Sequence, residues 1–164
     1  FVNEGYLENE NVSEKEFETL KKIVEIEREG AKTLKELAKN SKFFFVDEFS
    51  LPEVKEDMDK KERKSVERLL NSLKDEVGLK SIKLFIEKLE KWEGNEFTAE
   101  QAKDLLHSLL DDLQEGPGKI FMPLRAVLTG ATKGADLYNI LYVIGKERAL
   151  KRIKDTVKKY NIAL

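Results

Sequence analysis

The chain has 164 residues, of which 40% are hydrophobic and 38% charged, with a formal net charge of −2 and no cysteine. This composition supports a core, and it excludes disulfides, thiolate metal sites, a cysteine nucleophile and, with His107 as the only histidine, a histidine-rich metal cluster. No apolar run reaches the roughly 18 residues that span a bilayer and no signal peptide is visible, so we expect a cytoplasmic protein without a membrane partner.

Helical periodicity runs along the whole chain and predicts an all-α fold without a significant sheet. Ser13 and Glu16 form a capping box that opens a helix ending near Gly30. Thr33 can cap a short second helix, and the Phe43-Phe44-Phe45 triplet is interpreted as core rather than as a stacking platform. The apolar residues of these two helices are Phe17, Leu20, Ile23, Val24, Leu34 and Leu37.

The segment 47–56 contains Pro52 and several acids and breaks the helical pattern. We therefore predict a helical connecting subdomain over residues 1–55 and a second helical subdomain over residues 56–164. Helices are expected at about 60–77 and 81–92.

After a turn at Gly94-Asn95, Thr98 and Gln101 form a second capping box and open a helix to about Leu113. His107 lies on this helix beside leucines. We interpret it as a structural histidine rather than as a ligand or a base.

The sequence Gly116-Pro117-Gly118 predicts a loop, and Pro123 suits the first turn of the next helix. Gly130 can end that helix as a left-handed cap. Gly145 interrupts the last apolar stripe, so a final helix follows it. The apolar residues expected inside are Leu124, Val127, Leu128, Leu137, Ile140, Leu141, Ile144, Ala149, Leu150, Ile153 and Val157.

The charge is unevenly distributed. Residues 117–164 hold ten Lys or Arg and three Asp or Glu, whereas the rest of the chain is acidic. A basic third on an acidic body fits an anionic partner that binds at one end, although a solvated lysine-rich helix gives the same pattern.

Nothing in the sequence marks a catalytic centre. No glycine spacing fits a Walker or Rossmann phosphate loop, and the carboxylates follow the usual solvated pattern of pairs with lysine.

Two blocks carry a resemblance. Residues 121–137 read FMPLRAVLTGATKGADL, and residues 144–153 read IGKERALKRI. In this order they resemble the C-terminal, anticodon-binding region of bacterial-type glutamyl-tRNA synthetases, and AKTLKEL at 31–37 followed by FFF at 43–45 matches more loosely. The resemblance implies a two-part helical cage, in which the first subdomain bridges from the catalytic body and the second grips the anticodon loop.

The resemblance also implies where the chemistry lies. The signatures of a class I synthetase catalytic domain are absent from this chain, which begins at Phe1 rather than at methionine. We therefore expect a fragment without cofactors of its own, inactive alone, from a monomeric glutamate–tRNA ligase whose missing N-terminal domain uses ATP and magnesium. The implied partners are the anticodon stem-loop of tRNA and that catalytic domain.

Single-stranded RNA loops are read by stacking and by hydrogen bonds to base edges, while Lys and Arg hold the phosphates. Arg125 should point away from the core, and the 129–136 loop leads into a helix N-terminus that suits phosphate or base oxygens. Lys151, Lys154 and Lys158 predict one basic stripe and Arg148 and Arg152 a neighbouring one. The expected tRNA-binding residues are Arg125, Thr129, Gly130, Lys133, Gly134, Leu137, Arg148 and Arg152.

Two of these residues carry a role from the resembled family. The arginine of Pro-Leu-Arg and the leucine twelve residues later surround the first anticodon letter there, and they correspond to Arg125 and Leu137. A threonine that some members use does not carry over, because Gly134 occupies its position.

In discriminating members an arginine near the position of Gly30 contacts the third anticodon letter. It favours the cytosine of glutamate tRNA over the guanine of glutamine tRNA. Glycine cannot make that contact, which suggests the non-discriminating type that charges both tRNAs with glutamate. Two alternatives stay open: Gly30 is the C-cap of the first helix, or Arg28 or Lys32 supplies the contact.

Two hypotheses therefore remain for function. The first is the anticodon-binding region of a glutamyl-tRNA synthetase, which the ordered motifs favour. The alternative is a helical protein-interaction module whose basic tail binds an acidic partner.

Overall fold

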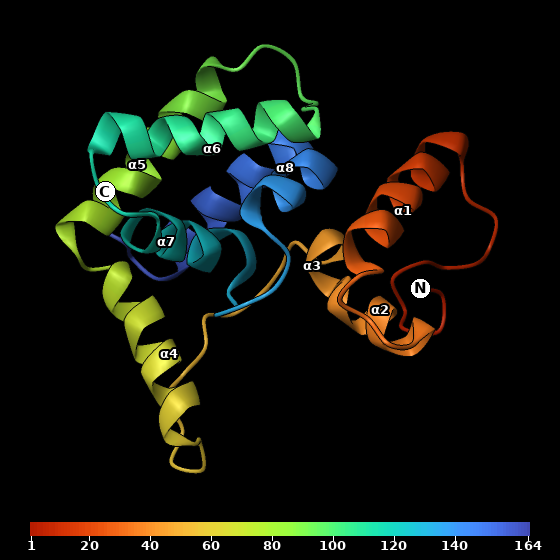
Figure 1. The fold of residues 1–164 in the computed structure, drawn as a ribbon, viewed down its shortest axis with the longest axis horizontal. Coiled ribbons are helices and arrows are strands. Elements are labelled where there is room, and N and C mark those ends of the chain that lie inside the picture. Colours follow the sequence, from red (N-terminus) through yellow and green to blue (C-terminus); the bar gives the residue numbers. More distant parts are fainter. The chain divides into compact units, whose positions relative to one another are not determined.

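The computed structural model describes residues 1–164 and contains eight helices and no strand, which confirms the all-α prediction (Figure 1). No helix combines the length and the apolar character needed to cross a bilayer. The helices are α1 (Glu14–Glu27), α2 (Leu34–Asn40), α3 (Lys42–Phe45), α4 (Lys60–Ser72), α5 (Glu76–Lys91), α6 (Ala99–Leu113), α7 (Pro117–Thr129) and α8 (Leu137–Lys159).

Both predicted capping boxes are present. The Ser13 hydroxyl accepts a hydrogen bond from the Glu16 N–H, and the Glu16 side chain accepts one from the Ser13 N–H. Thr98 and Gln101 make the same reciprocal pair at the start of α6. Thr33 caps α2 by accepting from the Glu36 N–H. These helix starts are local in sequence, and so they were predictable from it.

The chain divides into two compact units, residues 1–47 and residues 48–164. The first unit contains α1, α2 and α3. Phe44 is buried in its core, as interpreted from the sequence, and the Phe45 ring contacts Tyr6 and Phe1 at centroid distances of 5.0 and 5.1 Å. The other buried apolar residues of this unit are Ile23, Leu37 and Ala38.

Three apolar residues expected inside the first unit are exposed instead. Phe17 is 51%, Val24 39% and Leu34 86% exposed. Within this unit α1 packs on α2, and only Ile23 and Glu27 of α1 are buried. The apolar stripe read from the sequence is wider than the contact that buries it.

The division falls earlier than the boundary expected after residue 55. The segment 49–51 belongs to the second unit because the end of α8 holds it. The Leu51 N–H donates a 2.8 Å hydrogen bond to the Tyr160 hydroxyl, and Lys159 Nζ donates one of 3.2 Å to the Phe49 carbonyl. Leu51 itself is buried.

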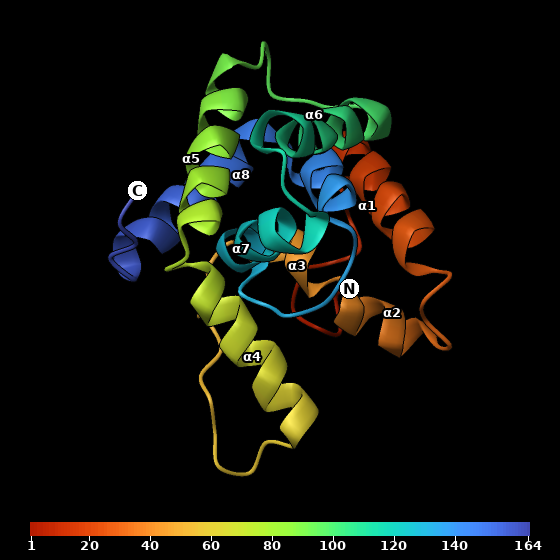
Figure 2. The ribbon, with the colours of Figure 1, turned by 60° about the vertical axis from the view of Figure 1, so that its left-hand side comes forward.

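In the second unit, α7 packs against α4, α5 and α8, while α6 packs against α8 and α5 (Figures 1 and 2). The apolar face of α7 is therefore covered by its neighbouring helices. Its buried residues are Ile120, Pro123, Leu124, Ala126, Val127, Leu128 and Thr129. Burial of such a continuous apolar face is the main force that holds this unit together.

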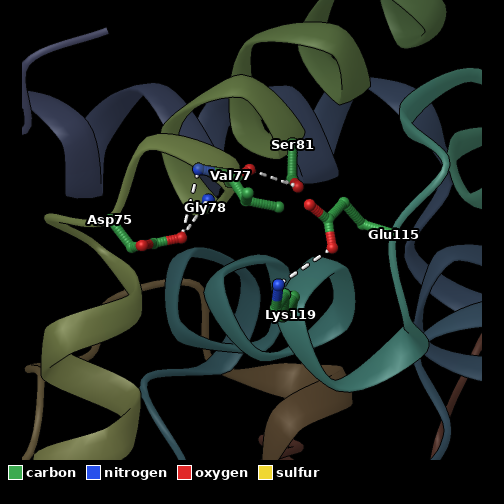
Figure 3. A network of polar contacts seen from close by, with 6 residues as sticks. All are labelled: Asp75, Val77, Gly78, Ser81, Glu115 and Lys119. Carbon is green, nitrogen blue, oxygen red and sulfur yellow. Dashed lines mark hydrogen bonds and ion pairs between the residues drawn. The ribbon is translucent and has the colours of Figure 1, made fainter.

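The single helix predicted over residues 60–77 is wrong. α4 ends at Ser72 and α5 begins at Glu76, with Asp75 accepting hydrogen bonds from the N–H groups of Val77 and Gly78 at 3.1 and 3.3 Å (Figure 3). Gly78 lies against the end of α4, where a Cβ would stand 1.8 Å from the Ser72 carbonyl oxygen. This corner depends on a helix–helix contact that periodicity does not show.

The start of α7 also differs from the prediction. The helix begins at Pro117, and Pro123 lies inside it rather than in its first turn. Pro117 suits this position because the first N–H groups of a helix have no partner within it. A 3.0 Å ion pair between Glu115 and Lys119 spans this start (Figure 3).

The interruption at Gly145 is confirmed. Gly145 has φ of 77° and splits α8 into two helical segments. Asn95, from the turn between α5 and α6, caps the second segment. Its carbonyl accepts from the Lys146 N–H and its Oδ1 accepts from the Glu147 N–H, each at 2.8 Å.

Candidate nucleic-acid interface

The second unit contains a pocket of about 200 Å³ between α6, α7 and the start of α8. Two residues that were predicted from the sequence, Arg125 and Leu137, both line it. They lie on different helices and meet because the 130–136 loop turns the chain back. The remaining lining residues are Lys103, Leu106, His107, Phe121, Asp136 and Tyr138.

Arg125 is half-buried, which corrects the expectation that it points freely away from the core. Its Nη1 donates a 3.0 Å hydrogen bond to the carbonyl of Ala135. Burial lowers the pKa of the guanidinium, and the carboxylate of Asp136 acts in the opposite direction. An arginine stays protonated under such a shift, so the pocket wall carries a partly desolvated cation with further N–H donors.

Leu137 is 5% exposed. It is the first residue of α8, and it therefore serves both the core and the pocket wall. This placement confirms that Leu137 is a core residue, while its contact with a base stays a prediction.

The loop between α7 and α8 begins with a left-handed residue. Gly130 has φ of 66° and is the C-cap of α7, as predicted. A Cβ there would lie 2.6 Å from the Phe49 ring and 2.7 Å from the Ser50 carbonyl oxygen, so only glycine fits.

The other predicted loop residues differ in access. Thr129 is buried, and its hydroxyl donates to the Arg125 carbonyl at 2.8 Å and accepts from the Ala131 N–H at 3.1 Å. Thr129 and Gly130 therefore shape the loop from inside. Lys133 and Gly134 are exposed at its tip, where a ligand can reach them.

Sequence reasoning missed the contribution of α6. Lys103 and His107 are exposed, lie one helical turn apart, and line the pocket opposite α7. The Lys103 ammonium lies 5.9 Å from the centre of the Tyr138 ring. The i, i+4 spacing of the two basic residues was the available signal, but the leucines around His107 favoured a structural interpretation.

Of the two basic stripes predicted on the last helix, the stripe of Lys151, Lys154 and Lys158 is exposed, as expected, but the stripe of Arg148 and Arg152 is not. Arg152 is 1% exposed, and its Nη1 donates a 3.1 Å hydrogen bond to the Leu128 carbonyl, so the expectation of a surface arginine is wrong. Arg148 is half-buried. Lys151 pairs with Asp155 at 2.6 Å and Lys154 with Glu90 at 2.8 Å. Two of the three lysines of the exposed stripe therefore have an acidic partner within the protein.

In the first unit, the expectation that Gly30 is the C-cap of α1 is wrong. α1 ends at Glu27, Arg28 is its C-cap, and Gly30 lies in the turn that follows. Gly30 is exposed, and a Cβ there would meet only the Glu27 carbonyl oxygen, at 3.9 Å. Arg28 and Lys32 are exposed beside it. The backbone therefore does not require glycine here.

The fold is all-helical and therefore differs from the α/β architecture of dinucleotide-binding domains. A family model described as "Anticodon binding domain" matches residues 4–157, almost the whole chain, and the chain belongs to this family.

Its similar relatives are glutamate–tRNA ligases. The ligase of Fusobacterium nucleatum subsp. nucleatum is 91% identical over 164 residues, covering 100% of this chain and 32% of that protein. The ligase of Carboxydothermus hydrogenoformans is 33% identical over 153 residues, covering 93% and 28%. The chain thus spans about a third of the length of these relatives.

A solved structure supports the fold. The crystal structure of a glutamate tRNA ligase from Elizabethkingia meningosepticum, in complex with its amino acid, superposes with a TM-score of 0.70 at 27% identity. It covers 92% of this chain and 26% of that one.

Proposed function

We propose that this chain is the part of a glutamate–tRNA ligase that binds the anticodon loop of tRNA. The observation that carries this proposal is the meeting of Arg125 and Leu137 in one pocket, in a chain of the anticodon-binding family. The two residues are twelve positions apart, and only the fold explains why they line the same cavity.

The pocket supplies the kinds of group that read an unstacked base. Leu137, Phe121 and Tyr138 give it apolar and aromatic walls, and Arg125 gives charged N–H donors in a partly desolvated setting. Lys103 at the wall and Lys133 at the exposed loop tip suit the phosphates on either side.

The chemistry of the parent ligase belongs to another part of that protein. This chain holds no cluster of three or more His, Asp or Glu side chains that could bind a metal ion. We propose that the parent attaches glutamate to tRNA with ATP and magnesium in a separate catalytic domain, as a monomer in the cytoplasm.

The non-discriminating type is a finer proposal about specificity. Gly30 has open space around it and presents no side chain to a base. A larger purine at the third anticodon position would then be accepted, so that glutamine tRNA is charged with glutamate as well as glutamate tRNA.

A binding experiment tests the main proposal. RNA stem-loops with a glutamate anticodon and with a scrambled loop are titrated with the chain over a range of salt concentrations. We expect affinity for both to fall with salt, and the glutamate loop to bind more tightly throughout, by about 1–3 kcal/mol per altered base. Equal affinity for both loops would favour the alternative, a helical interaction module that binds an acidic partner through charge.

A further inference from the structure

Arg152 is among the largest fully buried side chains of the protein. A guanidinium remains charged, and removing it from water is unfavourable unless protein groups replace the lost hydration. The structure places such a group next to it, because Arg152 Nη1 donates to the Leu128 carbonyl at 3.1 Å.

The hydrogen bond from Arg152 reaches the C-terminal end of α7, because Leu128 lies there. Leu128 lies in the last turn of α7, where carbonyls have no partner within the helix and carry its partial negative charge. Arg152 comes from the second segment of α8 and supplies both a donor and a positive charge to this helix end.

The end of α7 is also where the pocket loop starts. Gly130 follows two residues after Leu128 and is wedged against Phe49 and Ser50. The Thr129 hydroxyl holds the Ala131 N–H. At the far end of the loop, Arg125 holds the Ala135 carbonyl.

We propose that Arg152 is a positioning residue for the pocket. It fixes the end of α7, from which the 130–136 loop departs, and thereby sets where Leu137 and the loop tip stand relative to Arg125. Arg152 does this without touching RNA, since its side chain is buried. The inference rests on the proposed function for its effect on RNA, but its effect on the loop stands apart from it.

Arg152→Met tests this inference because methionine keeps length and apolar volume and removes the charge and the donor. Lys158→Met is the matched control, since it removes the same charge from an exposed position on the same helix. Three quantities are measured: binding of the glutamate and scrambled stem-loops, the slope of log affinity against log salt, and amide hydrogen exchange in the loop.

For Arg152→Met we expect the preference for the glutamate loop to fall about tenfold, the size of one lost base contact. The salt slope should stay unchanged, because no phosphate contact is removed. Exchange at Ala131 should accelerate. Lys158→Met should keep the preference for the glutamate stem-loop and the exchange rate at Ala131 of the unmodified chain, whether or not the salt slope changes.

Several outcomes would overturn the inference. One is a folded Arg152→Met chain with unaltered loop exchange, and another is an altered preference accompanied by a smaller salt slope, which would make Arg152 an RNA contact. If Arg152→Met does not fold, Arg152→Gln takes its place with the same expectations, because glutamine removes the positive charge and is too short to keep the same donor position. If neither folds, Arg152 is required for the fold itself and the inference is wrong. An unmodified chain that does not prefer the glutamate loop would instead refute the proposed function, while loop exchange would still decide the positioning role.

Discussion

The guanidinium of Arg125 and the carbonyl of Ala135 are joined by a 3.0 Å hydrogen bond that closes the loop between α7 and α8. Arg125 therefore does two things at once. One nitrogen holds the loop, and the rest of the planar group forms part of the pocket wall. Arg125, which was expected to point away from the core, is therefore shared between the loop and the pocket wall.

Arg125→Ala should lower both stability and RNA affinity. Loss of a half-buried hydrogen bond from a charged donor should cost about 1–2 kcal/mol of unfolding free energy, and loss of the pocket cation about 1–3 kcal/mol of binding. Urea unfolding and stem-loop titration measure the two effects. Arg125→Lys keeps the positive charge but loses the planar guanidinium with its paired N–H donors. It should therefore recover the nonspecific affinity for RNA but not the preference for the glutamate stem-loop over the scrambled one. Full recovery of preference by lysine would contradict this.

Gly78→Ala should destabilise the second unit strongly. The new Cβ would stand 1.8 Å from the Ser72 carbonyl oxygen, and a backbone atom cannot move aside without opening the α4–α5 corner. We expect a loss of roughly 3 kcal/mol, at the upper end of overpacking effects, in urea unfolding.

Gly118→Ala is the matched control for that substitution. Gly118 lies in the first turn of α7, and a Cβ added there would have no atom within 4 Å, so alanine should stabilise by up to about 1 kcal/mol. Similar effects of the two substitutions would show that the corner is more tolerant than its geometry indicates.

The sequence was sufficient for features that depend on neighbouring residues. The capping boxes at Ser13 and Thr98, the glycine cap at Gly130 and the break at Gly145 all have local causes. The α4–α5 corner was missed because Gly78 is constrained by Ser72 across a tertiary contact, and a glycine within a helical pattern gives no sign of that.

The same distinction applies to the pocket. Arg125 and Leu137 were predictable because they lie in an ordered motif, whereas Lys103 and His107 enter the pocket only through the packing of α6 on α8. Arg152 was wrongly predicted to lie on the surface. The i, i+4 spacing of Arg148 and Arg152 is the same whether that face of α8 is exposed or packs against the C-terminal end of α7. Which face of α8 is covered depends on α7 and cannot be read from α8 alone.

Glu27→Gln should stabilise the first unit at neutral pH. Glu27 is 8% exposed, and burial raises the pKa of its carboxyl. Because the pKa of Glu27 is higher in the folded than in the unfolded state, its full contribution to the free energy of unfolding is present below the unfolded-state pKa, about 4.3, and is lost as pH rises through the folded-state pKa. Glutamine cannot ionise and does not show this loss. The variant should therefore be more stable than the unmodified chain above this pH range and equally stable towards pH 4.

Thermal unfolding followed by circular dichroism from pH 4 to pH 8 measures this effect. The gain should stay within about 1 kcal/mol, because the carboxyl keeps some contact with solvent. Glu25→Gln, at an exposed position of the same helix, removes the same charge and serves as the control. An advantage of glutamine that is constant over the whole pH range would argue against burial as the cause.

Gly30→Arg tests the proposed specificity in the full-length protein, which we propose to be a glutamate–tRNA ligase. The substitution should leave the fold intact, because Gly30 is exposed, its φ is not in the left-handed region, and the nearest atom to a new Cβ is 3.9 Å away. We expect the unmodified enzyme to charge glutamine tRNA with glutamate, and Gly30→Arg to reduce that activity while charging of glutamate tRNA continues. The reason is that the Watson–Crick edge of cytosine offers an arginine two acceptors, O2 and N3, whereas that of guanine presents two donors beside its single acceptor. Arg28→Ala and Lys32→Ala belong in the same assay, since either neighbour could supply the contact. If the unmodified enzyme does not charge glutamine tRNA, the non-discriminating proposal is wrong. In that case, a gain of glutamine tRNA charging by Arg28→Ala or Lys32→Ala would identify the residue that discriminates between the two tRNAs.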